Sequence, residues 1–205
     1  MSLFESLNES HIDLFKEIGN IGAGNAATSL SMMMGTKVDI SVPNASVIPI
    51  SKISQIFENP EEIVTGVRMK LAGEIPGFIL FIVDSKGTKK ILKKLVGYST
   101  DDLLNIDEMS RSALLEIGNI VCGSYLIALS NFSGLNTNAH VPELTVDMVT
   151  AVLAETCLNL MDYEDYTMIV ETNIIIEDEN IRAFLMFLPE SQGLKKILQK
   201  MGMEV

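Results

Sequence analysis

Hydrophobic and polar positions alternate with a helical period over residues 12–34. The apolar side chains Leu14, Ile18 and Ile21 recur at the spacing of one helix face. A second set of positions lies at i, i+4, i+7 and i+11, and it therefore forms one stripe along the same helix: Asp13, Glu17, Asn20 and Gly24. We predict that Ser10 caps the start of this helix and that Gly35 ends it.

This pattern occurs a second time in the chain. The run from Glu17 to Ile21 reappears letter for letter from Glu116 to Ile120, 99 residues later. Across the 23 positions from Asp13 to Gly35, nine are identical in the later copy. The equivalent stripe consists of Ser112, Glu116, Asn119 and Gly123, between the predicted cap Ser110 and the predicted stop Gly134. The sequence therefore carries one candidate site twice.

The repetition extends to the end of the chain. Residues 87–92 are echoed by residues 193–198, at a separation of 106, so the second copy holds seven extra residues between Pro142 and Phe184. A period of about 100 residues is too long for a solenoid. We therefore predict a tandem duplication within a single domain, with repeats at about 8–97 and 107–203 related by a pseudo-two-fold axis.

Strand patterns follow the long helix in each repeat. They cover residues 36–42, 63–71 and 78–83 in the first repeat, and 167–176 and 181–188 in the second. Residues 72–74 and 177–180 are typical of hairpin turns, and short helices are predicted at 89–95 and 195–201. Hairpins favour an antiparallel sheet, so the predicted class is α+β, with two long site-bearing helices packed on that sheet.

Residues 146–160 also show helical spacing of apolar side chains. The first repeat has no helical counterpart of equal length. A function that the two repeats do not share is expected in this segment.

Composition narrows the class of protein. The formal charge of −12 would repel phosphate backbones, which argues against nucleic-acid binding. There is no secretory signal and no membrane-spanning run, so a cytoplasmic location is expected. Cys122 and Cys157 are predicted to be buried free thiols. Because His11 and His140 are the only histidines, no metal site is predicted.

The paired Glu and Asn carry the candidate chemistry. In one copy, such a pair is most simply a solvated helix face, but the pair recurs while its neighbours Lys16 and Leu115 differ. Asparagine and glycine both weaken a helix interior, so their repeated use points to the close approach of a partner. A carboxamide can hold a water molecule in place, and a carboxylate can pair with a cation. The pattern favours a protein that completes the active site of another protein.

Part of the first stripe also resembles a dinucleotide-binding pattern. Residues 22–27 fit the pattern Gly-x-Gly-x-x-Ala, but that pattern must follow a strand and open a helix. Here a helical stretch precedes it, and the second copy lacks the first glycine. The pattern therefore does not indicate a nucleotide site.

Both copies fit the signature (Asp/Ser)-x3-Glu-x2-Asn-x22-Pro, which ends at Pro43 and at Pro142. In this the chain resembles the CheC, CheX and FliY phosphatases of bacterial chemotaxis. Two motifs in about 200 residues are most similar to the CheC type. The resemblance covers essentially the whole chain and implies hydrolysis of the aspartyl phosphate of the response regulator CheY.

The resemblance also implies roles for individual residues. Asn20 and Asn119 would position the attacking water, while Glu17 and Glu116 would pair with the active-site lysine of CheY. No cofactor of the protein's own is implied, and Mg²⁺ would be held by CheY. Proteins similar to CheC also bind the receptor deamidase CheD. The resemblance implies that this chain would do so through the helix at 146–160, with Asp147 as a binding residue. A non-catalytic adaptor that regulates CheD or CheY is the alternative.

Overall fold

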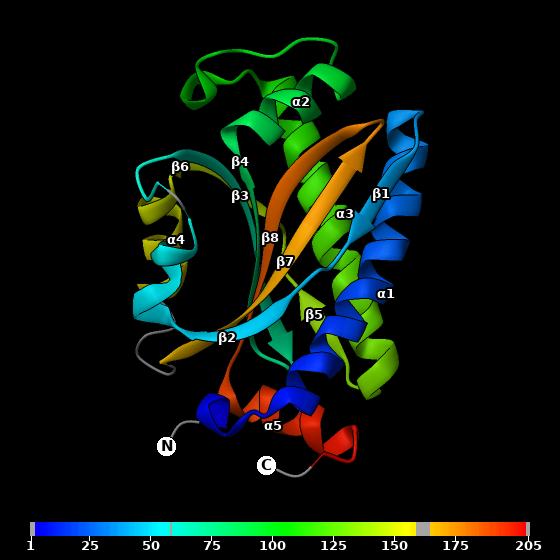
Figure 1. Ribbon diagram of the computed structural model, residues 1–205, viewed down its shortest axis with the longest axis vertical. Helices are drawn as coiled ribbons and strands as arrows, with labels where there is room; N and C mark the ends of the chain where they lie inside the picture. Colours follow the sequence, from blue (N-terminus) through cyan, green and yellow to red (C-terminus); the bar gives the residue numbers. More distant parts are fainter. Residues whose placement is uncertain (1–2, 58, 159–164, 204–205) are drawn as a thin grey trace.

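The computed structural model describes residues 3–57, 59–158 and 165–203. It forms a curved antiparallel sheet with helices on both faces and at both ends (Figure 1). The helices are η1 (Leu3–Ser6), α1 (Glu9–Met34), η2 (Ile50–Ile56), α2 (Ser85–Leu95), η3 (Leu103–Asn105), α3 (Glu108–Ser133), α4 (Val149–Leu158) and α5 (Ser191–Lys200), where η marks a 3-10 helix. The strands are β1 (Val38–Ser41), β2 (Ala45–Pro49), β3 (Ile63–Gly73), β4 (Gly77–Asp84), β5 (Thr137–Ala139), β6 (Glu143–Met148), β7 (Tyr166–Ile176) and β8 (Glu179–Pro189). The predicted α+β class is confirmed.

The two long helices, α1 and α3, end where the sequence predicts but begin earlier. Gly35 and Gly134 both adopt the left-handed conformation that favours glycine at a helix C-terminus. The predicted caps Ser10 and Ser110 are wrong. The side chains of Asn8 and Asp107 cap the helices instead, each accepting a hydrogen bond from the backbone N–H three residues later.

The strands of the two predicted repeats are interleaved in the sheet. Its order is β1-β7-β8-β4-β3-β5, with β2 also paired to β7 and β6 also paired to β3. The strands β1 and β2 thus pair with a strand of the later repeat, and β5 and β6 pair with a strand of the earlier one. This exchange is what a two-fold relation between repeats would produce. It supports the duplication, which stays an inference from the sequence.

The sheet has an apolar core on each face. On one face, α1 and α3 lie side by side and run in opposite directions (Figure 1), covering a large cluster that includes Phe15, Tyr125 and Phe187. On the other face, η2 and α4 cover a smaller cluster that includes Ile53, Val152 and Phe184. The sheet is buried on both faces, and this explains the nearly continuous apolar runs in β4 and β8.

The segment at residues 146–160 differs from its prediction. Residues 143–148 form strand β6, and helix α4 begins only at Val149. Asp147 therefore lies on a strand, opposite Val64 of β3, and not on a helix. Helix α4 starts 99 residues after η2, which begins at Ile50, so its counterpart is a short 3-10 helix. Residues 159 and 160 of the predicted helix lie outside the described residues.

Helix α3 is the one helix in the described part of the chain whose length and hydropathy could span a membrane. However, 56% of its apolar window is buried inside the protein, as in a core helix. Cys122 on this helix is a buried free thiol, as predicted, and burial raises the pKa of that thiol. The side chain of Cys157 lies outside the described residues.

Candidate active site

The predicted polar stripe of α1 lies on the solvent side of the helix. Asp13, Glu17, Asn20 and Gly24 are all exposed. The opposite face of α1 is buried in the core through Phe15 and Ile18. The helix is thus fixed to the sheet while its stripe remains available to a partner.

The stripe of α3 is presented in the same way. Ser112, Glu116 and Asn119 are exposed, and Gly123 is partly exposed. Because α1 and α3 are antiparallel and cross near Gly22 and Tyr125, Asn20 and Asn119 are offset by about eight residues, or about 12 Å along the helix axes. The two asparagines are therefore separate along the helices.

Glycines on the buried sides of these helices allow the close packing. A Cβ atom on Gly22 would lie 2.8 Å from the Cα atom of Tyr125 on α3. A Cβ atom on Gly118 would lie 2.3 Å from the Cβ atom of Val67 in the sheet. In contrast, a Cβ atom on Gly24 or Gly123 would have no neighbour within 4 Å. These two stripe glycines leave open surface beside each Glu and Asn.

The carboxamide of Asn20 is held by the backbone that follows strand β1. The Val42 N–H donates a hydrogen bond to Asn20 Oδ1, at 3.2 Å. Val42 directly precedes Pro43, so this bond explains why asparagine and proline keep a fixed spacing in the first copy of the signature. This bond uses one lone pair of Oδ1, so the second lone pair and the amide NH2 group of Asn20 can still bond a ligand.

The second asparagine lacks this restraint. Among the described residues, no side-chain hydrogen bond of Asn119 is present, and Val141, the counterpart of Val42, is 83% exposed. Pro142 is only partly exposed, and the loop that contains it leads from β5 into β6. The two copies of the signature thus hold their asparagines differently, and comparing the repeats by sequence alone gave no sign of this.

The chemistry of each stripe is limited to positioning and charge. In the described part of the chain, no cluster of three or more His, Cys, Asp or Glu side chains could hold a metal ion. The pattern at residues 22–27 lies in the middle of α1, so it does not follow a strand as a dinucleotide site requires. What remains is an exposed carboxylate one turn from an exposed carboxamide, present twice.

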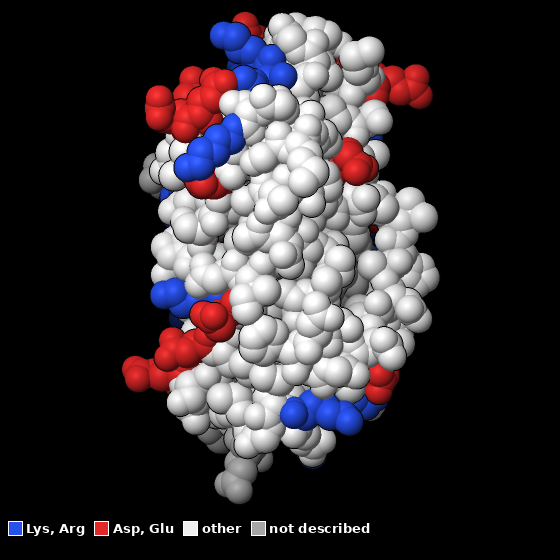
Figure 2. All heavy atoms as spheres, turned by 90° about the vertical axis from the view of Figure 1, so that its right-hand side faces the viewer, with Lys and Arg blue, Asp and Glu red and all other residues white. Residues whose placement is uncertain are grey.

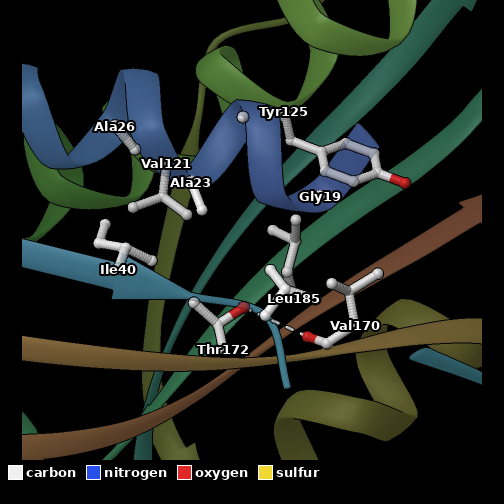
Figure 3. Close-up of a pocket in the computed structure, with 11 residues that line it drawn as sticks. Gly19, Ala23, Ala26, Ile40, Val121, Tyr125, Val170, Thr172 and Leu185 are labelled. Atoms are coloured by element: carbon white, nitrogen blue, oxygen red, sulfur yellow. Dashed lines mark hydrogen bonds between the residues drawn. The ribbon is translucent and has the colours of Figure 1, made fainter. Parts of the chain in front are cut away.

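A small cavity lies beneath the stripe of α1. It is enclosed by Gly19, Ala23, Val42, Tyr125 and Val170, together with neighbouring residues of the core (Figure 3). Its accessible volume is about 10 Å³, room for about one water molecule. The cavity is too small for a substrate, so any reacting group must approach from the solvent side of the helices.

Comparison with known proteins places the chain in a family. A profile of the CheC-like family matches residues 11–47, and a profile of the chemotaxis phosphatase CheX matches residues 65–159. The chain is 30% identical to the CheY-P phosphatase CheC of Bacillus subtilis over 206 aligned residues, which cover 98% of this chain and 99% of the relative. The chain belongs to the CheC-like family. This confirms the resemblance seen in the signature.

Two further relatives agree with this family. The CheC-like chain is 29% identical to the flagellar motor switch phosphatase FliY of Bacillus subtilis, over 71% of this chain and 38% of that protein. Its fold matches the crystal structure of Thermotoga maritima FliY with a TM-score of 0.78 at 23% identity, covering 96% of this chain and 98% of that one. At this identity, the match to the Thermotoga maritima structure shows a shared fold and nothing further.

Asp147 is remote in sequence from both stripes. Its Oδ1 atom accepts a hydrogen bond from the backbone N–H of Met148, at the point where β6 passes into α4. Helix α4 is held to the sheet by Arg68 of β3, which forms ion pairs with Glu143 at 2.6 Å and Glu155 at 3.0 Å. Helix α4 thus covers a different face of the sheet from the two stripes, whereas β6 lies beside α3, where Arg111 donates a hydrogen bond to the Leu144 carbonyl at 3.4 Å.

Proposed function

We propose that this protein hydrolyses the aspartyl phosphate of a phosphorylated CheY. The observation that carries the proposal is the exposed Glu-x-x-Asn stripe, which occurs twice in a chain 30% identical to a CheY-P phosphatase. The paired carboxamide can hold a water molecule but does not itself attack phosphorus, so the attacking group in this proposal is water. CheY brings the phosphoryl group, and Mg²⁺ bound to CheY balances its charge.

Each stripe residue has a distinct role in this proposal. Asn20 and Asn119 hold the attacking water in line with the phosphorus atom by hydrogen bonds from their carboxamides. Water oxygen bonds to phosphorus, the bond from phosphorus to the aspartate oxygen breaks, and inorganic phosphate leaves. Glu17 and Glu116 pair with the active-site lysine of CheY and so orient the complex.

The test of this proposal removes both carboxamides. We expect Asn20→Ala together with Asn119→Ala to abolish the stimulated release of phosphate from phosphorylated CheY. The fold should survive: loss of the exposed Asn119 side chain alters the free energy of unfolding by about 0.5 kcal/mol, whereas Asn20→Ala leaves the Val42 N–H without its partner and costs about 1–3 kcal/mol. Each single variant should keep part of the activity, since the sites are separate. Full activity in a folded double variant would disprove the catalytic assignment.

We further propose that the β6–α4 segment binds CheD. Helix α4 lies on the other face of the sheet from both stripes, so a partner bound to it leaves them accessible. The family resemblance implies that Asp147 contacts CheD. We expect Asp147→Lys to weaken CheD binding at least about tenfold, because reversal of an interface charge leaves an uncompensated group. A titration of labelled CheD measures this, with phosphate release from CheY as the control that should not change. Identical binding curves would place CheD elsewhere.

A further inference from the structure

The surface around the two stripes is almost free of charge. No Asp, Glu, Lys or Arg occurs at residues 18–36 or 117–142, although 20% of the chain is charged. Figure 2 shows the side of the molecule that carries α1 and α3, where the charged side chains lie mainly toward the margins. Surfaces depleted in charge and containing exposed apolar side chains are typical of the cores of protein interfaces.

The two stripes extend by one position at each end, and there they differ. On α3 the extended stripe begins at Met109 and finishes at Ile127, which are 63% and 59% exposed. The equivalent positions of α1, 99 residues earlier, are Ser10 and Thr28. Each apolar side chain on α3 is thus replaced by a hydroxyl on α1.

The α1 stripe carries more charged side chains than the α3 stripe. The α1 stripe carries two carboxylates, Asp13 and Glu17, with Lys16 beside them. The α3 stripe carries only Glu116, since Ser112 stands in place of the aspartate and Leu115 in place of the lysine. The α1 stripe therefore carries one more carboxylate than that of α3, whereas the α3 stripe has an exposed apolar side chain at each end, with the exposed Glu108 and Arg111 flanking Met109.

We propose that Met109 and Ile127 determine how the receiver domain of CheY is held, and that they make the α3 stripe the tighter of two unequal sites. The inference rests on the proposed function, because the occupant is the partner whose phosphoryl group reaches Asn119. Apolar contacts on both sides of the motif bind the receiver with little dependence on salt. The α1 stripe lacks both apolar side chains and carries one more carboxylate, so its affinity depends more on charge and falls further as salt is raised.

The experiment compares the sites one at a time. Asn20→Ala leaves only the α3 site active, and Asn119→Ala leaves only the α1 site. We expect the KM for phosphorylated CheY to be lower in the first variant, and to rise less when the salt concentration is increased. Equal KM values with equal salt dependence would overturn the inference.

A swap between the stripes assigns the difference to the two side chains. In the Asn20→Ala background, Met109→Ser with Ile127→Thr should raise KM about tenfold without lowering kcat, because two contacting apolar side chains are removed. In the Asn119→Ala background, Ser10→Met with Thr28→Ile should lower KM. The matched control is Leu104→Ser, which removes an apolar side chain of similar exposure, 55%, from η3, outside both stripes. An effect of the control as large as that of the swap would overturn the inference.

Binding experiments separate this inference from the proposed function. Fluorescence anisotropy with a labelled CheY receiver, activated by beryllofluoride and Mg²⁺, reports affinity without hydrolysis. Absence of hydrolysis with binding that still depends on Met109 and Ile127 would overturn the function and keep the inference. Normal hydrolysis, with an affinity that is unchanged when both residues are replaced, would keep the function and overturn the inference. A change in particle mass by light scattering in the swapped variants would mean that the surface joins two copies of the chain, and would also overturn the inference.

Discussion

At the scale of single residues, Glu17 and Glu116 are surface carboxylates whose contribution to binding can be measured only with a partner present. Each lies one turn before its asparagine and faces solvent. If they pair with a lysine of CheY, then Glu17→Lys with Glu116→Lys places like charges in contact, which can cost several kcal/mol. We expect a higher KM for phosphorylated CheY and a smaller change in the rate at saturation.

The control for this prediction is a charge reversal away from the stripes. Glu61→Lys changes the net charge by the same two units as each single stripe variant, at an exposed position that precedes β3. It should leave KM close to that of the unchanged protein. If the stripe variants behaved like Glu61→Lys, the carboxylates would not face the partner.

Single residues also show what a sequence pattern can and cannot predict. Helical spacing correctly placed Glu17, Asn20 and their counterparts on the solvent side, because a period of 3.6 residues defines a face. The pattern could not reveal the bond between Asn20 and Val42, since the two residues are brought together only by tertiary packing. The N-caps were misplaced because Ser110 is itself the residue whose N–H is capped, by Asp107 at 2.8 Å.

At the scale of elements, the packing of α1 against α3 depends on glycine at one position and not at another. Gly22→Ala would force a methyl group against the backbone of Tyr125, and overpacking of this kind costs about 1–3 kcal/mol. Gly24→Ala, two residues away, meets no atom within 4 Å and should stabilise the helix by about 1 kcal/mol. Thermal unfolding of the two variants should therefore shift in opposite directions. Shifts of the same sign would contradict this account of the helix interface.

The β6–α4 segment shows why short elements are hard to predict. Leu144, Val146 and Met148 alternate along β6, and helix α4 follows with no turn between them. An apolar pattern that spans a strand and a helix without a break can be fitted by helical spacing alone, and Asp147 was therefore assigned to a helix. Longer elements were predicted to within a few residues because their periods repeat several times.

At the scale of the whole molecule, the sequence predicted two similar halves but not how they are joined. Strand patterns show which residues pair within a hairpin, as in β3–β4 and β7–β8. They carry no information about pairing between distant segments, such as β1 and β2 with β7. The halves are consequently more intimately joined than two repeats packed side by side.

This interleaving leads to a prediction about the halves themselves. A fragment that ends after Ser99, between α2 and η3, would lose β7 as the partner of β1 and β2, and would lose β8 as the partner of β4. It would also expose the side of α1 that packs on α3. Unpaired strand edges and a bare apolar face leave too little burial to offset the chain entropy of folding. Neither half alone should therefore show a cooperative thermal transition by circular dichroism.

The two fragments expressed together should associate, because each supplies the strands that the other lacks. Size-exclusion chromatography would then give one particle with the mass of the intact chain. Its phosphate release from phosphorylated CheY should recover, since each stripe lies wholly within one fragment and needs only a correctly packed helix. Independent folding of either half would show that the exchanged strands are dispensable, and the two sites would then be separable modules.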